Sequence, residues 1–297
     1  MKNKIAGATF ALLAGTAMVA NATEGGTSVY PVGTENYTCC ALPPPGTYGM
    51  VFYQNYTATK VKDDSGNTVT PPTFKVTANA VASRLVYVTK DTVMGGSLGY
   101  HAILPVVNLD VNVAPGLGQS KSGIGDIVFG PVVGFHHSHN LHTVVALDII
   151  APTGAYTKGD LANIGKNHWA FQPVYGVSYI DPNGMNADLK LMYTIQMKND
   201  ATGYKDGQEF IADYALGWGL GNGWVVGVGG YIYQQTTDDE QNGATVANNK
   251  GRAFAIGPSI RYDSGKGWFL TAKFQQESNV ANRAEGQAFW LKAVIPL

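Results

Sequence analysis

Long stretches of this chain alternate apolar and polar side chains with a period of two residues, the spacing that gives a β-strand two different faces. Residues 187–198 show the pattern most clearly, and residues 209–220 and 268–277 repeat it. In the first stretch one face carries Ala187, Leu189, Leu191, Tyr193, Ile195 and Met197, and the other carries Asp188, Lys190, Met192, Thr194, Gln196 and Lys198. This pattern predicts an all-β fold.

The predicted strands are long and follow one another closely. Segments of about 9 to 14 residues begin at Thr47, and they are separated by turn-forming runs of Gly, Asn, Asp and Ser at 63–67, 181–184, 221–223 and 264–267. Strands of globular sheets usually have about five or six residues, whereas ~9–11 are needed to cross a bilayer at a tilt. The segments therefore predict a closed antiparallel up-and-down transmembrane β-barrel at residues 47–297.

A water-soluble β-sandwich alternates in the same way, so other features must decide which face meets lipid. Aromatic residues lie at predicted strand ends, as in the interfacial girdles of membrane barrels: Trp169, Tyr179, Trp218, Trp224, Tyr262 and Trp268. Short turns also alternate with long polar loops at 199–207 and 238–251. We therefore expect apolar rows toward lipid, since a one-residue slip would expose Lys190 there at a cost of ~2–4 kcal/mol.

The number of strands depends on how the region between Thr92 and Leu117 is counted. About 13 segments can be marked, but a closed antiparallel barrel with both ends on the same side needs an even number. The alternation is interrupted between Thr92 and Leu117, where Pro105 and Pro115 cannot donate ladder hydrogen bonds. We expect 12 strands, with 14 as the alternative.

The N-terminal region divides into two parts. Lys2 and Lys4 precede an apolar stretch at 5–19 and the small residues Ala20 and Ala22, so residues 1–22 are interpreted as a secretory signal peptide. Residues 23–46 lack alternation and contain three consecutive prolines, which predicts a periplasmic arm or a plug in the lumen. This segment also holds Cys39 and Cys40, which are interpreted as two free or externally paired thiols; the alternative is a strained vicinal disulfide, which a mass measurement would detect.

Composition excludes several other classes of protein. Only 14% of residues are charged and the formal net charge is -1, so the clustered basic residues of a nucleic-acid binder are absent. Two cysteines are too few for a disulfide scaffold, and the aromatic content of 11% is too high for a disordered chain. The sequence has no run of 18 apolar residues after the leader, which excludes a helical membrane protein.

Charged residues on the polar faces of the predicted strands are the candidate functional residues. They are expected to line the lumen: Asp148, Asp188, Lys190, Lys198, Glu209, Asp213, Arg261, Lys273, Glu277 and Lys292. Mixed signs predict no strong preference for cations or anions. Apolar Met192, Ile211, Phe269 and Trp290 on the same face could contact a phenol-like solute. Alternatively, these charges pair across a packed, closed lumen.

Other chemistry is less well supported by the residues. His136, His137, His139 and His142 surround a turn, but neighbouring residues of a strand point to opposite faces, so at most two or three imidazoles could meet. Ser138 beside His139, or Ser178, could serve a membrane-embedded hydrolase, but no nucleophile motif surrounds either serine. The glycines at 217–221 precede no helix, so they are not a dinucleotide loop. We predict no catalytic residue, no cofactor and no metal site.

Several motifs resemble those of the phenol meta-pathway degradation protein family. They are GIGDIVFGP at 123–131, APTGAY at 151–156 and NIGKN at 163–167, followed by similar stretches at 178–182, 207–210, 221–231 and 265–269. The resemblance implies a Gram-negative outer-membrane barrel linked to phenol-type catabolism, which passively admits small hydrophobic or aromatic compounds. We expect a monomer in the lipid bilayer. Members often end in Phe, and Leu297 departs from that pattern.

Overall fold

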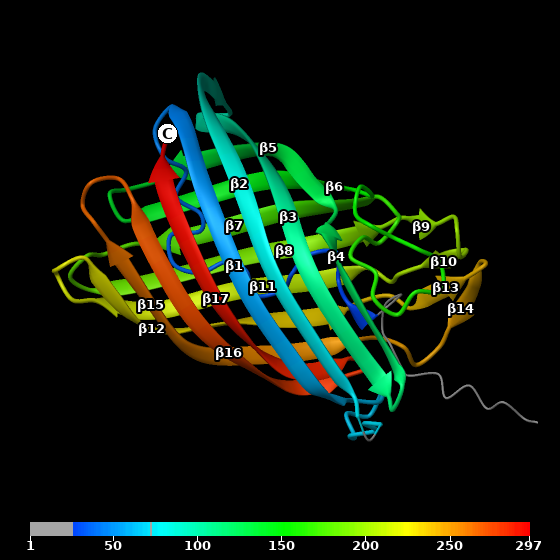
Figure 1. Ribbon diagram of the computed structural model, residues 1–297. Helices are drawn as coiled ribbons and strands as arrows, with labels where there is room; N and C mark the ends of the chain where they lie inside the picture. Colours follow the sequence, from blue (N-terminus) through cyan, green and yellow to red (C-terminus); the bar gives the residue numbers. More distant parts are fainter. Residues whose placement is uncertain (1–25, 72) are drawn as a thin grey trace, which may run out of the picture.

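The computed structural model describes residues 26–71 and 73–297, and the predicted signal peptide therefore lies outside the described residues. Within these residues the chain is all-β (Figure 1). The wall consists of β1 (Gly46–Val61), β2 (Lys75–Val93), β3 (Gly96–Ala114), β4 (Leu117–Ile124), β5 (Ile127–His136), β6 (Leu141–Ala151), β7 (Ala170–Tyr179), β8 (Met185–Gln196), β11 (Glu209–Gly219), β12 (Trp224–Gln235), β15 (Arg252–Asp263), β16 (Phe269–Ala281) and β17 (Ala284–Pro296).

The wall closes because the first strand pairs with the last. β1 and β17 are antiparallel from Tyr48 opposite Pro296 to Val61 opposite Ala284, and β17 lies between β1 and β16 in Figure 1. β4 and β5 both pair with β3 on the same edge, so they occupy one position in the wall. Over the described residues the barrel therefore has the twelve strand positions that were predicted.

Pro105 explains why the sequence indicated an odd number of segments. β5 pairs with β3 as far as Ile103, and β4 pairs with it from Val106 onward. Pro105 lies between the two pairings and cannot donate a hydrogen bond, while its carbonyl accepts one of 2.9 Å from the Gly125 amide. The opposing strand is therefore interrupted between β4 and β5, so the thirteen strands of the wall fill twelve positions.

The outer face of the barrel is an apolar belt, as the alternation predicted. Leu85 on β2, Val145 on β6 and Leu216 on β11 are each about half exposed, at 50%, 50% and 52%. At the end with the short turns Trp224 contacts Tyr262 and Tyr262 contacts Trp268, with ring centroids 4.8 and 5.8 Å apart. This apolar surface with interfacial aromatic rings is the arrangement that lipid stabilises.

The two ends of the barrel differ in their connections. Short turns join β7 to β8, β11 to β12 and β15 to β16, and Gly221 and Gly223 in one of them have φ of +79° and +86°, which favours glycine. At the other end, long loops form a small second sheet that the sequence did not predict. It consists of β9 (Lys198–Asn199), β10 (Tyr204–Lys205), β13 (Asp239–Gln241) and β14 (Ala244–Val246). In outer-membrane barrels the short turns are periplasmic and the long loops extracellular.

No helix within 26–71 and 73–297 is long and apolar enough to cross a membrane.

Candidate functional site: the barrel interior

The segment before β1 lies against the inner face of the barrel, and Asp213 on β11 is its central contact. The Tyr30 hydroxyl and the Glu35 amide donate to Asp213 Oδ2 over 2.8 and 2.9 Å, and the Gly33 amide donates to Oδ1 over 2.8 Å. Asp213 is 1% exposed. One buried carboxylate therefore holds three groups of the N-terminal segment through charge-assisted hydrogen bonds.

Glu35 carries the segment's own negative charge into the barrel. Its carboxylate forms ion pairs with Arg84 on β2 over 3.2 Å and with Lys292 on β17 over 3.1 Å. Lys273 on β16 donates to the Glu35 carbonyl. Because removing one partner of a buried pair leaves an uncompensated charge, these contacts constrain the segment strongly.

The contacts of this segment extend from one end of the barrel to the other. Near the long loops, Ser28 donates to Glu209 over 3.0 Å and accepts from Arg283 over 3.3 Å. Near the short turns, the Cys39 amide donates to Asp188 over 3.1 Å. Residues 28–39 therefore run along the interior from the loop end toward the turn end.

The structure places most of the predicted lumen residues on the inner face, where they are buried. They are Asp148, Asp188, Lys190, Glu209, Asp213, Arg261, Lys273, Glu277 and Lys292. Lys198 is not among them, because it lies in β9 beyond the end of β8, where it pairs with Asp200 over 3.1 Å and its side chain is 56% exposed.

Each inward charge that does not touch the N-terminal segment has a partner of its own on the wall. Asp148 bonds to His101 on β3 over 2.9 Å. Glu277 accepts a hydrogen bond of 3.0 Å from the Tyr56 hydroxyl. Arg261 pairs with Asp263. These three charged groups are therefore hydrogen-bonded or ion-paired within the wall.

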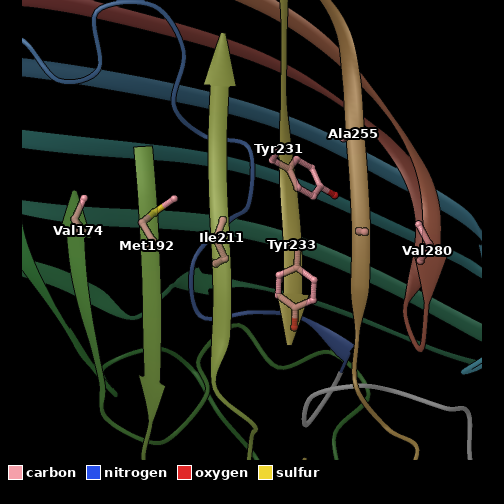
Figure 2. Close-up of a cluster of buried hydrophobic side chains, with 8 residues drawn as sticks. Val174, Met192, Ile211, Tyr231, Tyr233, Ala255 and Val280 are labelled. Atoms are coloured by element: carbon pink, nitrogen blue, oxygen red, sulfur yellow. The ribbon is translucent and has the colours of Figure 1, made fainter. Parts of the chain in front are cut away.

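Three of the four apolar residues expected to contact a solute are buried, whereas Phe269 is half-buried and lies beside the Arg261 guanidinium. Met192 and Ile211 belong to a buried cluster with Tyr231 and Tyr233, which Figure 2 shows on neighbouring strands of the wall. Tyr30 and Val32 of the N-terminal segment pack against this cluster. Trp290 is also buried, at 4% exposure. The β8 to β16 side of the interior is therefore a packed surface that the N-terminal segment covers.

The opposite side of the interior has a different character. Arg84 reaches Glu35 and His101 reaches Asp148, so even-numbered residues of β2 and odd-numbered residues of β3 face inward. Towards the loop end the inward residues are small or apolar and only partly buried: Ala78, Ala80 and Ala82, opposite Leu109, Val107 and Pro105. This partly exposed patch is called the alanine wall below.

Sequence reasoning missed four charged or titratable residues of the interior. Glu35 lies in a segment without alternation, so nothing in the sequence indicated its direction. Arg84, His101 and Arg283 are on or beside strands, where the same period-two reasoning would have placed Arg84 and His101 on the inner face. The weak contrast between the two faces of β2 and β3 hid that signal.

The loop sheet beside the barrel contains a buried carboxylate, Asp239. It accepts hydrogen bonds from the Gly207 amide, the Tyr204 hydroxyl and the side chains of Gln235 and Asn249. Burial raises the pKa of Asp239 to about 6, because desolvation disfavours the charged carboxylate more than these donors stabilise it. The charge of Asp239 in the loop sheet, at the extracellular end, therefore changes near pH 6.

The candidate hydrolase serines have structural partners. Ser138 Oγ accepts from the amides of Asn140 and Leu141 in the turn. Ser178 donates to Asp188 and accepts from the Cys40 amide over 3.0 Å. Both cysteine thiols are free. These bonds stabilise the turn and the N-terminal segment.

Comparison with known proteins places the chain in a family. The family model described as "Putative MetA-pathway of phenol degradation" matches residues 58–293. The chain belongs to this family. The match confirms the resemblance found in the sequence motifs, and it covers nearly the whole barrel. No curated protein matches the chain.

Solved structures show the same fold. The COG4313 outer membrane channel from Pseudomonas putida F1 superposes with a TM-score of 0.78 at 19% sequence identity, covering 88% of this chain and 98% of that chain. The transport unit of the autotransporter AIDA-I from Escherichia coli superposes with a TM-score of 0.51 at 8% identity, covering 84% and 89%. With the apolar belt, these similarities confirm an outer-membrane β-barrel.

Proposed function

We propose that this protein is a monomeric outer-membrane channel for passive uptake of small hydrophobic or aromatic compounds, serving phenol-type catabolism, with residues 23–46 as a plug. Membership of the phenol-degradation family and the channel fold support the substrate class. Passive movement needs no catalysis, cofactor or metal. The hydroxyl groups of Ser138 and Ser178 are engaged in hydrogen bonds of the turn and the inner face, which supports a structural role for both serines.

The alanine wall is the observation that carries this proposal. Tyr30 and Val32 of the N-terminal segment pack against the β8 to β16 side, where charged residues are buried, and Cys40 and Leu42 pack against β2, β5 and β6 near the turn end. Toward the loop end, the alanine wall on β2 and β3 is left partly exposed inside a closed barrel. An apolar solute gains about 25 cal/mol for each Å² of surface removed from water, so it would favour this side over the charged one.

The small size of the three alanines also matters. Ala78, Ala80 and Ala82 follow one another along the inward face of β2, and larger residues there would reduce the space between wall and plug. A flat aromatic ring is the kind of solute that fits beside such a surface. The mixed, paired charges on the other side give no continuous path for an ion.

A bulky substitution in the alanine wall tests this proposal against a matched control. Ala80→Trp would fill the interior, whereas Val81→Trp, one residue along the same strand, would project into the lipid belt, where Val81 is already 44% exposed. In proteoliposomes we expect phenol uptake to fall at least about fivefold in Ala80→Trp and to be unchanged in Val81→Trp.

The alternative function is a structural or envelope-interaction barrel with a closed lumen, which the buried charge pairs favour. Equal phenol flux in wild-type proteoliposomes and in protein-free liposomes would support this alternative and contradict the channel. Lipase or deacylase activity in the wild-type protein, lost in Ser178→Ala, would instead support the hydrolase.

A further inference from the structure

Two histidines meet at the periplasmic end of the barrel. His136 is the last residue of β5, and His142 is the second residue of β6, directly opposite in the register. Their Nδ1 atoms are 2.7 Å apart and their ring centroids 4.9 Å apart. The two imidazoles therefore face each other across the hairpin, and each presents its Nδ1 atom to the other ring.

Both side chains belong to the inner face. Gly134 and Val132 on β5 and Val144 on β6 are buried inward residues, and His136 and His142 continue their period-two rows. His136 is exposed and His142 is half-buried, so water and ions reach the pair from the turn end. His137 lies on the outer face, where its Nε2 contacts the Thr143 hydroxyl over 2.8 Å.

A carboxylate lies in the neighbourhood of the pair. His142 is opposite Ser178 in the register, and Ser178 is opposite Asp188, so a carboxylate lies two strands from the ring in the same polar row.

We propose that His136 and His142 bind one divalent transition-metal ion, such as Zn²⁺, Ni²⁺ or Cu²⁺, through their facing Nδ1 atoms at the periplasmic mouth. Directly opposed strand residues have Cβ atoms about 4.5–5.5 Å apart, which lets two imidazoles converge on one ion. Neutral imidazole is a preferred ligand of these metals. A small rotation of both rings opens the 2.7 Å gap enough to admit the ion.

Metal binding at this site requires one proton to move from one nitrogen of a ring to the other. In the metal-free pair one Nδ1 donates to the other, and metal binding needs a lone pair on both. The donating ring therefore moves its proton from Nδ1 to Nε2, and neutral imidazoles release no proton. Within the described residues no three His, Cys, Asp or Glu side chains form a metal-binding group, so water completes the coordination.

The test measures metal binding to the full-length exported chain, produced without a polyhistidine tag and folded in detergent micelles. Competition with a chromophoric chelator gives stoichiometry and affinity for Zn²⁺, Ni²⁺ and Cu²⁺. We expect one ion per chain and the tightest binding for Cu²⁺, following the order of divalent metals. Electron paramagnetic resonance of the Cu²⁺ form should show hyperfine coupling from two imidazole nitrogens.

Three single variants locate the site. His136→Ala and His142→Ala should each weaken binding about tenfold or more, whereas His137→Ala, in the same turn but on the outer face, should bind like the wild type. Folding of each variant is checked by its heat-dependent mobility on gels. Should a variant fail to fold, diethylpyrocarbonate modification of the wild type, with and without Zn²⁺, shows whether metal protects these two rings.

Several results would contradict the proposed metal site. They are the absence of stoichiometric metal binding, a Cu²⁺ spectrum without two nitrogen ligands, and a loss of metal affinity in His137→Ala equal to that in His136→Ala or His142→Ala. Retained binding in both His136→Ala and His142→Ala would show that the metal is held elsewhere on the chain.

Discussion

The Tyr30 hydroxyl donates a hydrogen bond of 2.8 Å to Asp213, although 183 residues separate the two in the sequence. Asp213 is on the barrel wall and Tyr30 is on the segment inside it, and the ring of Tyr30 also lies 5.0 Å from the Lys190 ammonium. This contact joins the two parts of the molecule that would have to separate for a wide pore to open.

Replacing Asp213 by Ala should loosen the N-terminal segment. Three donors lose a buried acceptor, and each unsatisfied group costs about 1–3 kcal/mol. Cys40 is 1% exposed and Cys39 is partly buried, so their reaction with a maleimide reports release of the segment. We expect labelling to become at least about tenfold faster.

The control for this experiment is Asp200→Ala, because Asp200 lies on a loop with 88% of its side chain exposed. Its labelling rate should equal that of the wild type. Equal rates in Asp213→Ala and the wild type would mean that Asp213 does not hold the segment.

Removal of residues 26–45 should leave a folded barrel with a larger conductance. The pairing of β1 with β2 begins at Gly46, so the deletion removes no ladder hydrogen bond of the wall. It exposes Asp213, Lys273 and their neighbours to water inside the barrel. Single-channel recording in planar bilayers should show a severalfold increase, and an unchanged current would argue against a plug.

Acidification should strengthen the loop sheet. Burial raises the pKa of Asp239 to about 6 in the folded state, so the folded state binds this proton more tightly than the unfolded state. The stabilisation is fully present below the unfolded pKa, near 3.8, and is lost as pH rises through about 6. The loop sheet should therefore be more stable at pH 5 than at pH 7.5.

Nuclear magnetic resonance can follow this titration through the Gly207 amide, which donates to Asp239 Oδ1. Its chemical shift should change with a midpoint near pH 6, and the change should disappear in Asp239→Asn. A midpoint near pH 4 would show that burial does not control this carboxyl group.

A lysine in the lipid belt should destabilise the barrel. Val228 lies near the middle of β12 and is 39% exposed on the outer face. Val228→Lys should lower the free energy of unfolding from lipid vesicles by about 2–4 kcal/mol, the cost of Lys near the bilayer midplane. Thr245→Lys on exposed β14 is the matched control and should have no effect. An unchanged free energy of unfolding in Val228→Lys would mean that this face of β12 does not contact lipid.

Much of the wall followed from the sequence because strand geometry is local. Leu189 and Lys190 point to opposite faces for any chain with extended backbone, and the run at 221–223 forms a turn because Gly221 and Gly223 accept positive φ. Pro105 marked the correct place for a disturbance, but only pairing with two successive strands shows that β4 and β5 share one position.

The period of the side chains thus determined the fold class, the lipid-facing rows and the inward charges of β6, β8, β11, β15, β16 and β17. Only the tertiary structure decided which inward residues are covered, because Glu35 and Tyr30 belong to a segment without periodicity and their partners are far away in sequence. The same holds for Lys198, which continues the alternation but lies beyond the last wall residue of β8. Local geometry depends on neighbouring residues, whereas closure of a barrel brings together groups that no local sequence pattern relates.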